Sequence, residues 1–208
     1  MRFQQGYWKI AEWRGAPLFL HVSLLVWPLL ELLYGAGPFM ALLSLPAYVA
    51  LVAAHEFGHA FMARWRGSRP ISIRIHLLHG RCEYEQAWSE FDDVLIAWAG
   101  VLAQMVLLAA ALAVQYLLDV FSPALLHAMQ PVFFVLIVIN CYTAILNLLP
   151  IKGLDGAKAW LIIVIALRNL RSRTRQAYAG WARQSRERKA MRSSKAMADD
   201  LIKRVKNK

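Results

Sequence analysis

Residues 55–59 read His-Glu-Phe-Gly-His and carry the residue types of a metal-hydrolase site. In a helix, His55 and His59 lie one turn apart on the same face, which suits two ligands of one zinc ion. Glu56, between them, can act as the base for a water bound to that metal. The alternative is a helix end whose polar residues merely face water. A zinc centre also requires a third ligand nearby, so its position must be found in the rest of the chain.

The surroundings of this pair are apolar. The chain has 208 residues, 59% of them hydrophobic, with a mean hydropathy of +0.40. A soluble domain is usually ~45–50% apolar, and here the excess is gathered in long blocks. We therefore expect an all-α membrane protein with a small β-hairpin or sheet on its cytoplasmic side. Histidine and glutamate are costly inside a membrane unless they are paired or functional, which favours a zinc site.

The apolar blocks predict about four transmembrane helices. These predicted spans are residues 18–34, 39–65, 94–118 and 124–149. With a shorter helix at residues 157–167, too short to span and therefore interfacial, they form a predicted core of residues 18–167. Between the second and third spans, residues 70–85 begin with strict apolar–polar alternation, which predicts two strands. Residues 1–17 are predicted to be an extended cytoplasmic segment.

Charge predicts the orientation of the spans. Residues 168–208, the predicted basic tail, hold 14 of the 24 Lys and Arg and 3 of the 13 Asp and Glu. Bases also lie near the N-terminus and after the second span, and none lies directly after the first or third span. Because basic loops stay in the cytoplasm, we expect a multi-pass protein of the cell membrane with both termini cytoplasmic. The tail is expected to contact anionic membrane lipid, and no nucleic acid is expected as a partner.

Orientation also narrows the search for the third metal ligand. A hydrolytic zinc site uses three protein ligands and leaves a fourth position open. The candidate carboxylates in apolar surroundings are Glu31, Asp119 and Asp155. Loop charges place Glu31 and Asp119 near the outer surface. Asp155 instead follows the fourth span at its inner end, on the side of the histidine pair, so topology favours Asp155.

Asp155 belongs to a second motif. Residues 147–156 read Asn-Leu-Leu-Pro-Ile-Lys-Gly-Leu-Asp-Gly, which resembles the Asn-x-x-Pro-x-x-x-Leu-Asp-Gly motif of the site-2 protease family, the intramembrane zinc metalloproteases. The His-Glu-x-x-His of residues 55–59 is that family's other signature, and the motifs stand in the family's order. Residues 15–21 are similar to the segment that commonly opens family members. The resemblance covers most of residues 15–160, in a minimal form without a PDZ or nucleotide-sensing domain.

The resemblance implies a role for each matching residue. His55, His59 and Asp155 would bind one Zn²⁺. Glu56 would take a proton from the zinc-bound water and pass it to the leaving amine. Asn147 would hydrogen-bond the substrate backbone or the oxyanion, the alternative being a helix–helix hydrogen bond. The implied substrate is a transmembrane protein cut in or near its span, as in regulated intramembrane proteolysis, with a regulatory membrane protein as a candidate second partner.

The third span departs from the family pattern. The usual Ala-Gly-Pro-x-x-Asn is Ala-Gly-Val-Leu-Ala-Gln at residues 99–104. The proline that weakens the helix is missing, and Gln104 stands where asparagine is usual. Gln104 keeps an amide for the substrate or oxyanion. Equally, Gly100 and Ala103 fit close helix packing with no further role.

Two questions stay open at this level. The strand of residues 71–77 either holds an extended substrate by β-addition or only connects two spans. The chain itself is predicted to be a zinc metalloendopeptidase, and the alternative is a non-catalytic membrane zinc-binding or scaffold protein with the same fold. A third reading is another class of membrane metalloprotease, with a glutamate as third ligand.

Overall fold

Three helices are long and apolar enough to cross a membrane in the part of the chain that the computed structural model describes, residues 3–4, 6–35, 37–77 and 80–206. The first two are α2 (Pro38–Trp65) and α3 (Glu90–Phe121). The third, Gln130–Asn147, joins α5 (Gln130–Phe133), the π-helix η2 (Phe134–Ile139) and α6 (Asn140–Asn147). The second and third predicted spans are thus confirmed as helices. The predicted fourth span begins too early, because Pro131 opens a new helix after the short α4 (Pro123–Ala128).

The predicted first span, residues 18–34, is wrong in its first part. Residues up to His21 belong to strand β3 (Ala16–His21), and the helix that follows is η1 (Val22–Leu25) with α1 (Val26–Leu33). This apolar helix, Val22–Leu33, falls short of the ~20 residues that cross the hydrocarbon. A short apolar run fits a buried strand as well as a helix, and in this strand the side chains of Ala16 and Leu18 are buried.

The strands form one five-stranded sheet in the order β1-β2-β3-β4-β5. It contains β1 (Phe3–Gln4), β2 (Tyr7–Trp13), β3, β4 (Pro70–Ile75) and β5 (Gly80–Tyr84). Only the β3–β4 pairing is parallel among these strands, with Leu18 opposite Ile73. The predicted hairpin at residues 70–85 is therefore present as β4–β5, within a larger sheet that the N-terminal segment completes. The strand β5 lies at one end of this order.

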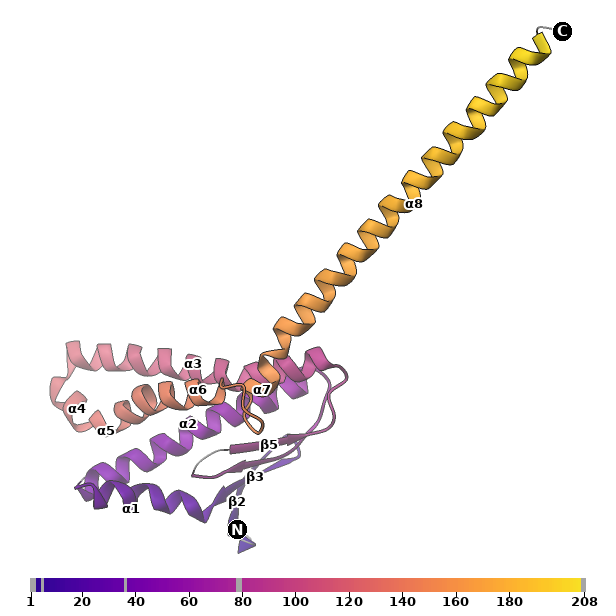
Figure 1. Ribbon diagram of the computed structural model, residues 1–208. Coiled ribbons are helices and arrows are strands. Elements are labelled where there is room, and N and C mark those ends of the chain that lie inside the picture. Colours follow the sequence, from indigo (N-terminus) through magenta and orange to yellow (C-terminus); the bar gives the residue numbers. More distant parts are fainter. Residues whose placement is uncertain (1–2, 5, 36, 78–79, 207–208) are drawn as a thin grey trace. The chain divides into compact units, whose positions relative to one another are not determined.

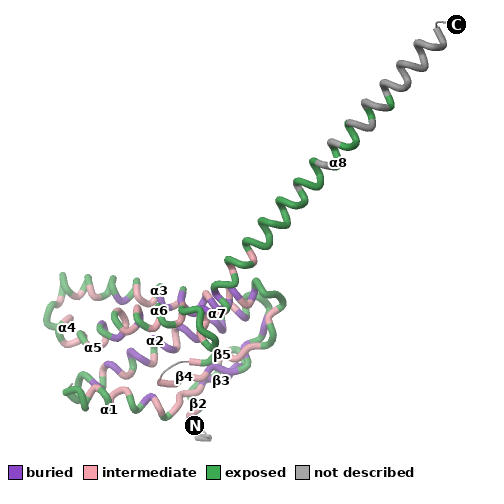
Figure 2. The backbone as a smooth tube through the Cα atoms, viewed as in Figure 1, coloured by how far each residue is buried: buried purple, intermediate pink, exposed green. Residues whose placement is uncertain are grey.

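Helix α2 lies between the sheet and helices α3 and α6 (Figure 1). Buried apolar side chains from α2, β4 and η2 form one core, with Leu51, Ile73, Ile75 and Val135 almost wholly enclosed. Buried residues in α3 gather in its N-terminal half, beside this core (Figure 2). The C-terminal half of α3 exposes apolar side chains, as expected of a helix that faces lipid.

The chain divides into two units, Met1–Ile162 and Ile163–Lys208. The predicted short helix at residues 157–167 is instead α7 (Gly156–Ala159) followed by α8 (Leu161–Lys206), which does not end at residue 167. The second unit is the greater part of α8. Its sequence is rich in Arg, Lys and Ala and lacks proline, the residue that most disfavours a helix.

Candidate metal site

The histidine pair lies where α2 and α3 cross closely. His55, Glu56 and His59 are all buried, on the helix face that also carries Leu51. A Cβ atom on Gly100 of α3 would collide with His59 Nε2 and lie 2.7 Å from His55 Cε1. Gly100 therefore leaves room for the two imidazole rings.

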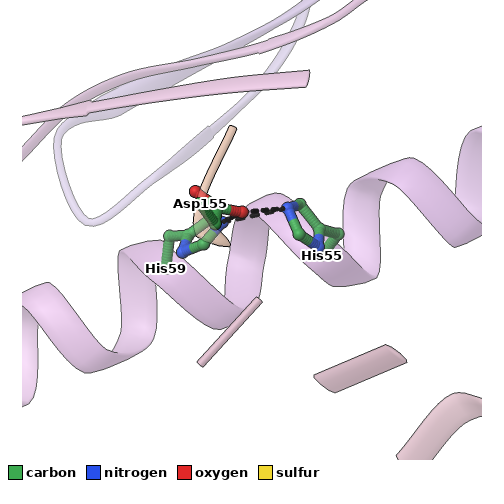
Figure 3. Close-up of side chains that lie close together, drawn as sticks. All are labelled: His55, His59 and Asp155. Carbon is green, nitrogen blue, oxygen red and sulfur yellow. Dashed lines mark hydrogen bonds and ion pairs between the residues drawn. The ribbon is translucent and has the colours of Figure 1, made fainter. Parts of the chain in front are cut away.

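Three ligand atoms converge at one point (Figure 3). Asp155 Oδ2 lies 2.9 Å from His55 Nε2 and 3.1 Å from His59 Nε2, and the two Nε2 atoms are 3.0 Å apart. A tetrahedral zinc ion with bonds of ~2.0–2.1 Å separates its ligand atoms by about 3.3 Å. Two imidazoles and one carboxylate at this spacing fit such an ion, with a fourth position open.

The outer ring nitrogens of both histidines face acceptors. His59 Nδ1 lies 2.7 Å from the carbonyl oxygen of Ile96, and His55 Nδ1 lies 3.0 Å from Gln104 Oε1. A carbonyl oxygen accepts only, so Nδ1 of His59 carries the proton and its Nε2 lone pair faces the other ligand atoms. Metal-bound histidines in proteins are commonly held in this way. The donor set is therefore prepared for a cation.

Asp155 reaches the pair because the chain turns back after α6. The helix ends at Asn147, before Pro150, and Gly153 has a φ of +102°, which favours glycine. The indole of Trp160 donates to Leu148 O at 2.7 Å, and that of Trp98 donates to Ala159 O at 3.1 Å. These bonds fix both ends of the loop that presents the carboxylate.

The pKa of the Asp155 carboxyl depends on the charge placed between the ligand atoms. Burial raises this pKa, but protonated imidazoles at His55 and His59 would outweigh burial through hydrogen bonds and positive charge and hold it well below its usual range. A cation bound between the neutral imidazoles would lower it in the same way. An ionised carboxylate is the form that binds a metal.

Glu56 lies against strand β5. Its carboxylate accepts a hydrogen bond from the backbone of Cys82, and a Cβ on Gly80 would collide with it. Cys82 itself is half-buried, and burial together with the charge of Glu56 raises the pKa of its thiol to about 12. Cys82 is therefore a neutral thiol at physiological pH, and it is not among the ligand atoms that converge with His55, His59 and Asp155.

A cavity of about 660 Å³ opens onto these groups. It is lined by the histidine pair, Glu56, Asn147, Asp155 and residues of β5. At one side Tyr84 of β5 donates to Asp93 at 3.1 Å, and Lys158 lies 3.5 Å from Asp93. The cavity thus lies between β5 and the loop that carries Asp155.

All six side chains named from sequence line this cavity. Asn147 Nδ2 lies 3.4 Å from His55 Nε2, so its amide is at the site. Gln104 is buried behind His55, where both ends of its amide have protein partners. The rejected carboxylate Glu31 accepts a hydrogen bond from Ser44, eleven residues before His55 in α2.

Three contributors were missed from sequence. The Ile96 carbonyl is a backbone group that no side-chain pattern reveals. Thr143 and Asn140 were detectable, because with Asn147 they recur at intervals of three and four on an otherwise apolar helix. Such spacing puts polar groups on one face of a membrane helix, which usually marks a functional or packing role.

A solved structure with a similar fold is the site-2 protease from Methanocaldococcus jannaschii. The alignment has a TM-score of 0.56 and 20% sequence identity, and it covers 76% of this chain and 71% of that chain. Neither a family model nor a curated protein matches the chain. The similarity therefore shows a site-2 protease-like fold, in which the chain carries a His-His-Asp cluster able to hold a metal ion.

Proposed function

We propose that the chain is an intramembrane zinc metalloprotease of the site-2 protease type, which hydrolyses a peptide bond in or near a membrane span of another protein. The observation that carries this proposal is the convergence of His55, His59 and Asp155 within hydrogen-bond distance of one another, next to the buried Glu56. A buried carboxylate beside three converging ligands, open to a cavity, is the arrangement of a metal hydrolase.

The roles follow from the chemistry of each group. His55, His59 and Asp155 hold the ion, and bound zinc supplies a Lewis acid that polarises a carbonyl and activates water. Glu56 takes the proton from the attacking water and later gives it to the leaving amine. Asn147 donates its amide N–H to the carbonyl oxygen that becomes negative.

Strand β5 is the proposed substrate guide. It is the last strand in the sheet order, and Gly80, Cys82 and Tyr84 line the cavity beside Glu56. A peptide bond is attacked in an extended chain, and an edge strand can hold such a chain by backbone hydrogen bonds. A membrane helix would unwind and pair with β5 before cleavage.

We further propose that both termini face the cytoplasm of a cell membrane. Helix α1 runs antiparallel to α2, since Trp27 stacks on Tyr48 while Glu31 meets Ser44 further back along α2. With three longer helices, both termini inside require Val22–Leu33 to make the first of four crossings, although it is shorter than the usual span, and the basic loops would lie inside.

The basic helix α8 is proposed to contact anionic lipid, and no nucleic acid is expected as a partner. Leu167, Leu170 and Trp181 recur at helical spacing and are exposed, with arginines on either side. In a flotation assay with anionic vesicles, replacing Arg171, Arg173 and Arg175 by glutamate should weaken the binding of a peptide of residues 163–208 by ~1 kcal/mol per charge. Unchanged flotation would exclude the lipid contact.

The test of catalysis compares one substitution at two carboxylates. Native membranes carrying Glu56→Gln should accumulate an uncleaved membrane protein that the wild-type chain cuts. In a bilayer, Glu56→Gln should slow cleavage of that protein by ~10²–10⁴-fold while zinc content stays the same. Glu31→Gln, the matched control, should leave the cleavage rate unchanged. Cleavage that survives Glu56→Gln would exclude the assigned base.

The same measurements separate the alternatives. Stoichiometric zinc with no cleavage of any membrane protein would indicate a zinc-binding scaffold. Zinc retained in Asp155→Ala would indicate a different third ligand, such as a glutamate.

A further inference from the structure

Gln104 of α3 is a fully buried amide beside the histidine pair, with 1% of its surface exposed. Its Oε1 lies 3.0 Å from His55 Nδ1, and its Nε2 donates to Thr143 Oγ1 at 2.9 Å. Both ends of the amide are thus engaged within the protein. This arrangement differs from the substrate or oxyanion contact predicted from sequence.

The direction of this hydrogen-bond chain is fixed at its far end. The Thr143 hydroxyl lies 3.0 Å from the backbone carbonyl oxygen of Asn140, which can only accept. The Thr143 hydroxyl therefore donates its single proton to the Asn140 carbonyl oxygen and accepts a hydrogen bond from Gln104 Nε2. The amide must then present its nitrogen to Thr143 and its oxygen to His55. His55 in turn must donate from Nδ1, which leaves the Nε2 lone pair toward Asp155 and His59.

Asn140 holds α6 and α3 in the register that this chain of hydrogen bonds requires. It is completely buried and follows the π-helix η2 directly. Its Nδ2 donates to the backbone oxygen of Gln104 at 3.0 Å and to that of Leu136 at 3.1 Å. The side chain thus joins α6 to α3 at the residue that contacts His55.

We propose that Gln104 is a positioning residue, which acts through Thr143 to hold His55 in its Nδ1–H form with Nε2 ready for the metal. The proposal rests on the metal site of the proposed function, and it gives Gln104 no contact with substrate. Without the Thr143 acceptor, the amide is free to turn its N–H toward His55. The imidazole would then move its proton to Nε2 and block the ligand position.

The test uses two substitutions at Thr143 in the full-length protein. Thr143→Val keeps the shape and removes the hydroxyl, whereas Thr143→Ser keeps the hydroxyl and removes a methyl group. Zinc affinity is measured by competition with a chromophoric chelator, and the ligand field by the d–d absorption of the Co²⁺ form. We expect about 10-fold weaker zinc binding and an altered cobalt spectrum for Thr143→Val, and wild-type values for Thr143→Ser.

Gln104→Leu should weaken zinc binding by ~10–100-fold, in line with other groups that orient metal ligands. If packing alone mattered, Thr143→Ser would be the more damaging change, and that result would overturn the proposal. Equal zinc affinity in both Thr143 variants, or a wild-type chain that binds no metal, would also overturn it. Absence of cleavage with the expected zinc pattern would refute only the protease function.

Discussion

Helix α2 carries a buried polar cluster in each half, and the two are built in opposite ways. In the N-terminal half, Trp27 donates to Ser44 at 3.0 Å, and Ser44 donates to Glu31. In the C-terminal half, two imidazole nitrogens and a carboxylate oxygen face one another at 2.9–3.1 Å. Both clusters pair a carboxylate with polar groups of α2. Only in the second do hydrogen-bond acceptors, the two Nε2 atoms and the Asp155 carboxylate oxygen, face one another.

The difference separates a structural cluster from a functional one. In the first cluster the Ser44 hydroxyl accepts from Trp27 and donates to Glu31, so its donors and acceptors pair without a ligand and join α1 to α2. In the second, the donors lie behind the histidines, at the Nδ1 atoms, and the lone pairs converge in front. Converging lone pairs repel unless a cation lies between them. Composition alone does not distinguish the two clusters; the direction of the hydrogen bonds does.

The largest expected effect is on metal binding. Asp155→Ala removes one of three ligands, so zinc affinity should fall by more than ~100-fold, beyond the range of groups that only orient ligands. Glu31→Gln should leave zinc affinity unchanged, because its cluster takes no part in the site. Chelator competition on purified protein measures both. Comparable losses of zinc affinity in Asp155→Ala and Glu31→Gln would contradict the assignment of one cluster as functional and the other as structural.

A smaller effect is expected at the helix crossing. Gly100→Ala places a Cβ against both imidazoles, so we expect ~10–100-fold weaker zinc binding from misplaced ligands. Gly180→Ala, in the open surroundings of α8, is the control and should bind zinc like the wild type. Unchanged zinc affinity in Gly100→Ala would mean that the rings do not occupy the positions described.

The smallest expected effect belongs to the structural cluster. Ser44→Ala leaves the Trp27 N–H and the Glu31 carboxylate without their shared partner, at a cost of ~1–2 kcal/mol in the free energy of unfolding. Zinc affinity of the folded protein should not change. Unfolding in mixed micelles with increasing dodecyl sulfate measures the first quantity. If Ser44→Ala lost zinc affinity with no change in the free energy of unfolding, the structural role assigned to this cluster would be wrong.

Much of the site was predictable because it depends on spacing and sidedness. His55 and His59 are one helical turn apart, and loop charges alone favoured Asp155 over Glu31 and Asp119. Strand β3 was misassigned because Leu18–His21 is apolar and continuous with the helix that follows. Its antiparallel pairing with β2 and its parallel pairing with β4, a contact some 55 residues away, make it a strand.

The groups behind the ligands were less predictable. The acceptor for His59 is a backbone carbonyl, set by where α3 crosses α2 and not by any side chain. Gln104 was identified, but its role depends on the position of Thr143 across a helix contact. The π-helix that precedes Asn140 has no sequence signal of its own, and it helps to set that contact.

The most direct test of the central claim is X-ray absorption at the zinc edge of the purified full-length protein. We predict one zinc per chain, bound by nitrogen and oxygen at ~2.0–2.2 Å with the scattering of two imidazoles. We predict no sulfur, although Cys82 lines the cavity, because its thiol is not among the ligand atoms that converge with His55, His59 and Asp155. A zinc–sulfur shell at ~2.3 Å, or no stoichiometric zinc, would contradict the site described here.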